Sequence, residues 1–501
     1  MRDLEQALNR DDWEAVDTLL DQRFFRYLYT NSELLERVFD SAGDQWFSDH
    51  PRQVLRRAVV DAVRRPGALL DERAQAEFDT WVRSQADPAL RDILGIRRAR
   101  LAELVSHGWH QDAADVVDQI LEDLKVWPGQ SEGLRDIMPG LMVSCGTAKL
   151  LAGDSDAAAT CFFEAVRWSS YERGHPFAPF ARGHLALVHV LSERYADAAQ
   201  LLEGVDQARS EPGTVAYASE GAGLLAQLLV HIASLDTGAV HRLLGRIDQA
   251  IIDGEWGWIA LHARAWAAIL DDQPWDLIHE INAVLVTTSL RTSPDTMAGA
   301  CLRADLVALY QAAGDLRAAD QVLATPKLPP TRSVVVLARA RQALLRGRPD
   351  HALALFRQEE TARGNLTPTR YGPTGAVLYA AAEIASAGQV SPSALQFAAS
   401  TVAYHRAFIA AANASPALRE LLLPLLDDAV PDVPAPWEHR TAVKLTRRER
   451  EVLSALRRHG GVAQVAAALH ISPNTAKTHI RALYRKLGAH NREEALWIAT
   501  R

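Results

Sequence analysis

The residues best suited to chemistry lie near the carboxyl end, where Lys477, Thr478 and Arg481 fall at helical spacing. Such cations pair with phosphate groups, and an arginine can also donate two hydrogen bonds to the edge of a guanine base. Residues 441–501 hold twelve Lys+Arg against four Asp+Glu, whereas the remaining chain carries 42 basic and 58 acidic groups. A basic tail on an acidic body indicates nucleic-acid binding by the tail, and the alternative is a solvated, salt-bridged surface.

The elements that must position these cations are predicted helices. The first spans 447–459 with Thr446 as an available N-cap, the second runs from Val462 to Leu469, and the third runs from Pro473 to Leu487. Ser472 is the N-cap of the third helix, and Pro473 occupies its first position. Two short helices joined by a three-residue turn predict a helix-turn-helix unit.

The third helix is amphipathic. Its apolar face holds Ala476, Ile480, Leu483 and Leu487. The other side carries Lys477, Arg481 and Arg485, so the exposed surface of the helix is expected to be cationic. After it, Asn491 followed three residues later by Glu494 predicts a capped fourth helix.

The quoted residues closely resemble a known family pattern. It comprises Leu445-Thr446-Arg447-Arg448-Glu449-Arg450-Glu451-Val452-Leu453, Val465-Ala466, Leu469, Ile471-Ser472-Pro473-Asn474-Thr475-Ala476-Lys477-Thr478-His479, Lys486-Leu487-Gly488 and Arg492. Together they resemble the LuxR-type (NarL/FixJ-like) DNA-binding domain. Two departures are the lack of a polar start to the second helix after Gly460-Gly461 and the presence of Ala476 in place of the commoner valine.

The resemblance implies that the third helix enters the major groove of double-stranded DNA. By position, it makes Lys477, Thr478 and Arg481 the base or groove contacts. The residues implied to contact phosphate or to support the helix are Thr475, His479, Lys486 and Arg492. In the family the fourth helix commonly pairs two domains, which implies a homodimer on DNA with Trp497 near the contact.

The rest of the chain shows an internal repeat: a glycine, an alanine five residues later and a large apolar residue four residues after that. Clear copies are Gly108/Ala113/Val117, Gly153/Ala158/Phe162, Gly314/Ala319/Leu323 and Gly347/Ala352/Phe356. Weaker copies are centred on Ala198, Ala239 and Ala394. Each copy predicts a helical hairpin whose small alanine allows close packing. In the hairpin that follows Ser293-Pro294, Ser293 is the expected N-cap.

A single hairpin cannot bury its own apolar face, so neighbouring copies are expected to stack into an α-solenoid. The segment from Gly153 resembles half of a tetratricopeptide repeat, and the spacing near 40 resembles the sensor regions of large LuxR-type activators. The predicted fold class is therefore all-α. We expect a tetratricopeptide-like repeat domain over 1–427, a Pro-rich linker over 428–443 and a helix-turn-helix domain over 444–501. The repeat register in residues 1–100 is left open.

Input to the repeat domain could be a small-molecule effector or a partner protein. The ligand-contact candidates are Trp256, Trp258 and Trp266, although a tryptophan at such positions is more often part of a repeat core. The string Gly140 to Gly146 lacks the lysine of a phosphate loop. No spacing supports a metal site, a cofactor site or a catalytic set. We therefore expect no enzyme activity.

The sequence thus predicts a cytoplasmic, DNA-binding transcriptional regulator controlled through its repeat domain. The three cysteines do not form a disulfide framework, and no window reads as a signal peptide or membrane span. One alternative is a repeat scaffold for protein binding that its tail tethers to DNA. A weaker alternative is a nucleotide-driven activator with a diverged nucleotide site.

Overall fold

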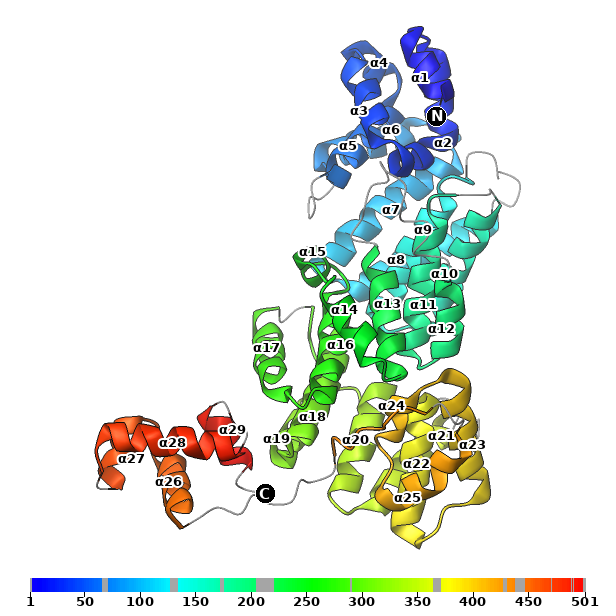
Figure 1. The fold of residues 1–501 in the computed structure, drawn as a ribbon. Helices are drawn as coiled ribbons and strands as arrows, with labels where there is room; N and C mark the ends of the chain where they lie inside the picture. Colours follow the sequence, from blue (N-terminus) through cyan, green and yellow to red (C-terminus); the bar gives the residue numbers. More distant parts are fainter. Residues whose placement is uncertain are drawn as a thin grey trace.

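The computed structural model describes residues 2–64, 71–126, 134–171, 175–203, 220–288, 291–363, 371–426, 430–437, 447–469, 471–487, 489 and 491–498. Within these ranges the chain forms helices and turns without any strand, which confirms the all-α prediction (Figure 1). None of the helices in this part of the chain is both long and apolar enough to cross a bilayer.

The helices of the amino-terminal half are α1 Arg2–Asn9, α2 Trp13–Thr30, α3 Ser32–Ser41, α4 Asp44–Asp49, α5 Pro51–Arg64, α6 Glu72–Ser84, α7 Leu90–His107, α8 His110–Val126, α9 Met138–Ala152, α10 Ser155–Ser170, α11 Ala178–Leu191, α12 Tyr195–Leu202, α13 Glu220–Ala233, α14 Thr237–Leu244 and α15 Gln249–Asp253. Those that follow in the repeat region are α16 Gly257–Leu270, α17 Pro274–Thr287, α18 Met297–Ala313, α19 Leu316–Leu323, α20 Ser333–Leu345, α21 Pro349–Arg363, α22 Gly372–Ala387, α23 Pro392–His405, α24 Phe408–Ala411, α25 Pro416–Leu422 and η3 Leu423–Leu425. The carboxyl-terminal set is α26 Arg447–Arg458, α27 Val462–Ala468, α28 Pro473–Leu487 and α29 Arg492–Ile498.

In the hairpins of the repeat region the two helices are connected by a similar short turn, which we call the joint. The residue that ends the first helix adopts the left-handed conformation, as at Gly153 with φ 91°. The next N–H then bonds five residues back, from Asp154 to the Lys149 carbonyl at 2.9 Å, and the Asp154 carboxylate caps the second helix through the Ala157 N–H at 3.0 Å. The small residue five positions after each clear joint is fully buried, which confirms the predicted packing role of Ala113, Ala158, Ala319 and Ala352.

The same joint also forms without glycine. Its left-handed residue is then Asp11, Glu193, Leu235 or Asp272. At the amino terminus, the Asp12 N–H bonds the Ala7 carbonyl at 3.1 Å and the Asp12 carboxylate caps α2. Val16, five positions after Asp11, is fully buried. The first hairpin therefore shares the register of the later ones, a point that the sequence left open.

Two details of the predicted repeats are corrected by the structure. Helix α18 begins at Met297, and its cap is Thr296, whose hydroxyl accepts the Gly299 N–H at 3.0 Å. Ser293 is not that cap because its hydroxyl bonds the Asp295 carboxylate at 2.5 Å. In the last weak copy, Ala394 is only partly buried, since a longer turn capped by Ser391 shifts the fully buried position to Ala398.

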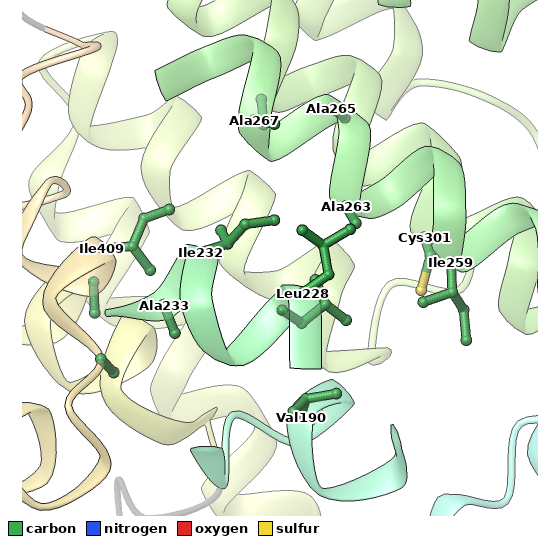
Figure 2. Packing of buried hydrophobic residues seen from close by; sticks show 14 of the residues in the cluster. Val190, Leu228, Ile232, Ala233, Ile259, Ala263, Ala265, Ala267, Cys301 and Ile409 are labelled. Atoms are coloured by element: carbon green, nitrogen blue, oxygen red, sulfur yellow. The ribbon is translucent and has the colours of Figure 1, made fainter. Parts of the chain in front are cut away.

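The repeat array folds back on itself. The inner helices α11, α13, α16, α18, α20 and α22 contact one another in that order, and α24 then returns to α13 while α23 returns to α12. Figure 2 shows this closure, with Ile409 of α24 beside Ile232 of α13, both in the largest apolar core. Because inner helices pack on both sides, their side chains are buried around most of the helix circumference.

Part of the expected linker packs against this core. Val430 and Val433 contact it, Trp437 is 9% exposed, and the Arg419 guanidinium donates to the Pro434 carbonyl at 3.2 Å. Residues 430–437 are therefore attached to the repeat region. The remaining linker residues, 428–429 and 438–443, lie outside the described ranges, and the division of the chain into domains stays a prediction.

Candidate DNA-binding surface

Helices α26 to α29 enclose a small core of their own. Its buried members are Val452, Ala455, Leu456, Val465, Ile480, Leu483, Ala489 and Ala495. Helix α28 contacts each of the other three helices. The core therefore fixes the direction of α28 and determines which of its faces remains open to solvent.

The start of α28 is held by the predicted cap. The Ile471 N–H bonds the Ala466 carbonyl at 3.0 Å and closes the turn after α27. The Ser472 hydroxyl accepts the Thr475 N–H at 3.1 Å and lies 2.8 Å from the Thr475 hydroxyl. This network confirms Ser472 as the N-cap and also occupies the hydroxyl of Thr475. Thr446, the expected cap of α26, lies outside the described residues.

The exposed face of α28 is cationic. Lys477, Arg481 and Arg485 are exposed, whereas Ala476 and Leu483 on the other face are fully buried. No carboxylate in the described ranges lies within ion-pair distance of these three cations. Their positive charge is therefore available to an anionic partner such as phosphate.

The other sequence-predicted residues occupy distinct positions around that face. Thr478 is exposed, but its hydroxyl donates to the Asn474 carbonyl at 3.0 Å, and His479 is half-buried. The Arg492 guanidinium donates through Nε to the Leu456 carbonyl at 2.8 Å, so it supports the end of α26. The side chains of Lys486, Glu494 and Trp497 lie outside the description.

A further pair of arginines was not singled out from the sequence. Arg457 and Arg458 are exposed in the last turn of α26, and the Arg458 guanidinium bonds the Ser454 hydroxyl at 3.2 Å. The only sequence signal was two successive basic residues at a helix end, which is also common for reasons of helix stability. They extend the basic character of the domain beyond α28.

The three tryptophans predicted as ligand contacts do not share one environment. Trp256 and Trp258 are 2% and 7% exposed within the main core of the repeat region. Trp266 lies at the other end of α16, is half-buried, and has the Arg341 guanidinium 5.7 Å from its ring centroid. Trp256 and Trp258 are thus packing residues in this structure, and ligand contact by any of the three stays a prediction.

Comparison with known proteins identifies the carboxyl-terminal helices. The family model described as bacterial regulatory proteins, luxR family, matches residues 443–499. The probable transcriptional regulatory protein NarL of Mycobacterium tuberculosis (strain ATCC 25618 / H37Rv) is 42% identical over 57 residues, which are 11% of this chain and 26% of that protein. The probable transcriptional regulatory protein SgaR of Hyphomicrobium methylovorum is 47% identical over 58 residues, 12% of this chain and 28% of that protein.

A third relative is the CsgBAC operon transcriptional regulatory protein of Escherichia coli (strain K12), 42% identical over 52 residues, which are 10% of this chain and 24% of that protein. The chain thus spans about a quarter of the length of the curated relatives it matches. In each case the matched length is that of a helix-turn-helix domain. The comparisons therefore identify residues 443–499 as a helix-turn-helix domain of the LuxR family. The match says nothing about the repeat region.

Proposed function

We propose that this chain, whose carboxyl-terminal helices form a helix-turn-helix domain of the LuxR family, is a DNA-binding transcriptional regulator. The observation that carries the proposal is the exposed face of α28, where Lys477, Arg481 and Arg485 stand opposite a fully buried apolar face. A helix of this kind can enter the major groove, place cations on the phosphates and present an arginine to a base edge.

In this proposal the role of each residue of α28 depends on its position along the helix. Lys477 and Thr478 lie in the first half of the helix and Arg481 just after its middle, and these three residues read bases or contact the groove walls. Arg485 and Lys486, nearer its end, hold phosphates together with Thr475 and His479, while Arg492 supports the domain. Helix α29 pairs two such domains, so the protein acts as a homodimer on double-stranded DNA in the cytoplasm.

The repeat region receives the signal, which is a small molecule or a partner protein, and controls the engagement of DNA. Support comes from the packing of Val430, Val433 and Trp437 on the repeat core, because residues 430–437 are the last described segment before α26 in the chain. A change in the repeat core can therefore alter how the DNA-binding domain is held. No step of this function requires catalysis.

The test is binding of the full chain to DNA fragments selected from the source genome, measured by fluorescence anisotropy. Arg481→Ala is expected to weaken binding to a selected fragment by ~1–3 kcal/mol and to weaken binding to random DNA less. Arg348→Ala, the same charge change at an exposed site in the repeat region, is the control. Equal losses on both DNAs would make Arg481 a phosphate contact, and failure of the unmodified chain to retain any fragment at low salt would refute the proposal.

A second candidate function is a protein-binding scaffold that the tail tethers to DNA. The observation that favours it is a pair of exposed aromatic side chains, Phe163 on α10 and Tyr171 at its C-cap, which are 57% and 59% exposed. Footprinting with purified protein separates the two functions. A metabolite that changes promoter occupancy without any other protein supports direct sensing, whereas unaltered occupancy and co-purification of one partner through Phe163 and Tyr171 support the scaffold.

A further inference from the structure

Charged side chains meet inside the repeat region where the array closes. We call Glu193, His262, Asp305, Arg341, Trp266 and Trp437 the Arg341 cluster. Asp305 is 3%, Arg341 5% and Trp437 9% exposed. The members come from the joint before α12, from α16, α18 and α20, and from the segment 430–437. Burial of so many ionisable groups costs free energy unless each finds a partner.

Arg341 is a buried cation without a close carboxylate. Its Nε donates to the Gln311 side chain at 2.7 Å and its Nη1 donates to the Asn413 side chain at 3.1 Å. Its guanidinium lies 4.5 Å from the ring centroid of Trp437 and 5.7 Å from that of Trp266. Among the described residues no carboxylate lies within ion-pair distance and no acceptor bonds Nη2. Burial lowers the pKa of Arg341 to about 10, which still leaves it charged near neutral pH.

Asp305 has a buried carboxylate oxygen that accepts no hydrogen bond from the described residues. Its Oδ1 lies 2.8 Å from Nδ1 of His262, and this pair raises the pKa of His262 despite the burial that opposes its charge. Its Oδ2 is buried and has no donor in the described part of the chain. A buried carboxylate oxygen without a hydrogen bond is unfavourable, so the site is incomplete on this side.

Glu193 does not neutralise Arg341 fully. One of its oxygens accepts the Thr374 N–H at 2.7 Å, at the start of α22. Burial nevertheless raises the pKa of Glu193 to about 7, so a substantial fraction of this side chain is uncharged near neutral pH. With His262 and Asp305 paired to each other, the cluster then retains an excess of positive charge.

We propose that the Arg341 cluster binds a small organic acid that carries both a carboxylate and a hydrogen-bond donor, as α-amino and α-hydroxy acids do. The carboxylate pairs with Arg341, the amino or hydroxyl group donates to Oδ2 of Asp305, and the carbon body lies against the indole rings of Trp266 and Trp437. A guanidinium matches a carboxylate in shape and charge, and fixed aromatic rings supply apolar contact. This inference rests on the proposed function in one respect: it takes the acid to be the signal that the repeat region receives.

The position of Trp437 connects the cluster to the DNA-binding domain. Trp437 stacks on Arg341 and ends the segment 430–437, and α26 begins at Arg447. An acid that pairs with Arg341 changes the surroundings of the Trp437 ring. Binding of the acid is therefore expected to change how residues 430–437 pack against the repeat region, and this segment precedes the DNA-binding helices in the chain.

The experiment titrates the full chain with the proteinogenic L-amino acids and with L-lactate, L-malate and phenyllactate, using calorimetry and tryptophan fluorescence. At least one acid is expected to bind, and its amide, which lacks the carboxylate, is expected to bind at least roughly tenfold more weakly. Arg341→Met is expected to weaken binding by at least roughly tenfold. Arg346→Met, at the end of the same helix and paired with Asp320, is the control and leaves affinity unchanged.

A second variant guards against unfolding of the first. Trp437→Phe keeps an aromatic ring on Arg341, so it is expected to fold, to bind the acid and to lose the part of the fluorescence change that comes from Trp437. The site is refuted if no acid in the panel binds, or if Arg341→Met, folded by its melting curve, binds as the parent does. Binding without any change in DNA occupancy upholds the site and refutes only its role as the signal. Control of DNA binding that persists unchanged in folded Arg341→Met refutes the site and leaves the proposed function standing.

Discussion

Helices α16 and α28 handle polar side chains in opposite ways. Helix α16 is packed between α13 and α18, and its His262 is held inside the protein by Asp305. Helix α28 buries only one face and leaves Lys477 and Arg481 open to solvent without a described counter-ion. A buried charge needs one particular partner, whereas an exposed charge can attract any polyanion. Variants of inner helices should therefore change stability, and variants of the open face of α28 should change DNA binding alone.

The largest expected effect is on the repeat core. Phe162→Ala removes a fully buried ring of the main core and is expected to destabilise the repeat region by ~3–5 kcal/mol through lost burial and the cavity left behind. Chemical denaturation followed by circular dichroism measures the change. The neighbouring Phe163 is 57% exposed, so Phe163→Ala is the matched control and should change stability by no more than about 0.5 kcal/mol. Similar losses in both variants would break the contrast between packed and open faces.

The second prediction concerns the stability of the repeat region at low pH. His184 is 1% exposed, its ring contacts Phe162 and Trp256, and burial lowers its pKa to about 4. The folded state thus binds fewer protons than the unfolded state below the ordinary histidine pKa, so stability falls as the pH drops from about 6.5 towards 4. The full loss from this group is about 3 kcal/mol.

Denaturation at several pH values between 7 and 5 measures this slope. His184→Phe is expected to flatten it, because the replacement ring carries no proton. His351→Phe, at an exposed position, should leave the slope unchanged. If His184→Phe kept the slope of the parent, the acid sensitivity would originate elsewhere.

These contrasts also show what sequence reasoning could reach. The copies with glycine at the joint were visible because glycine is the residue best suited to positive φ. The copies at Glu193 and Leu235 adopt φ of 57° and 60° with ordinary side chains, so the sequence showed them only as the weaker copies centred on Ala198 and Ala239. The joints at Asp11 and Asp272 were missed. Tertiary packing overrides the local preference at these positions.

The exposed face of α28 and the Arg341 cluster also differ in how far the sequence could predict them. The face of α28 depends on residues within one helix, so their spacing predicted it. The Arg341 cluster joins residues that are far apart in the chain, such as Glu193 and Thr374 or Arg341 and Asn413. No local spacing encodes that meeting, because it arises only when α23 and α24 return to α12 and α13. Trp437 was assigned to a linker for the same reason.

The third prediction isolates charge on the open face. Arg485→Gln removes one exposed cation that the proposal places on a phosphate, so it is expected to weaken binding to all duplex sequences alike and to reduce the salt slope by ~0.9 for the lost phosphate contact. Titrations at several salt concentrations measure the slope. Melting curves should coincide with that of the parent. A loss confined to one DNA sequence would instead make the residue a base contact, and a lowered melting temperature would mean that the face is not open.

The smallest expected effect compares two helix caps. Asp154 caps α10 through the Ala157 N–H at 3.0 Å, and Ser472 caps α28 through the Thr475 N–H at 3.1 Å. Replacement of either by alanine is expected to cost ~1 kcal/mol of stability in its own region. DNA affinity should fall only for Ser472→Ala, because fraying of α28 displaces the side chains at its start, including Lys477. Equal DNA affinity in the two variants would show that the first turn of α28 does not position the contacts.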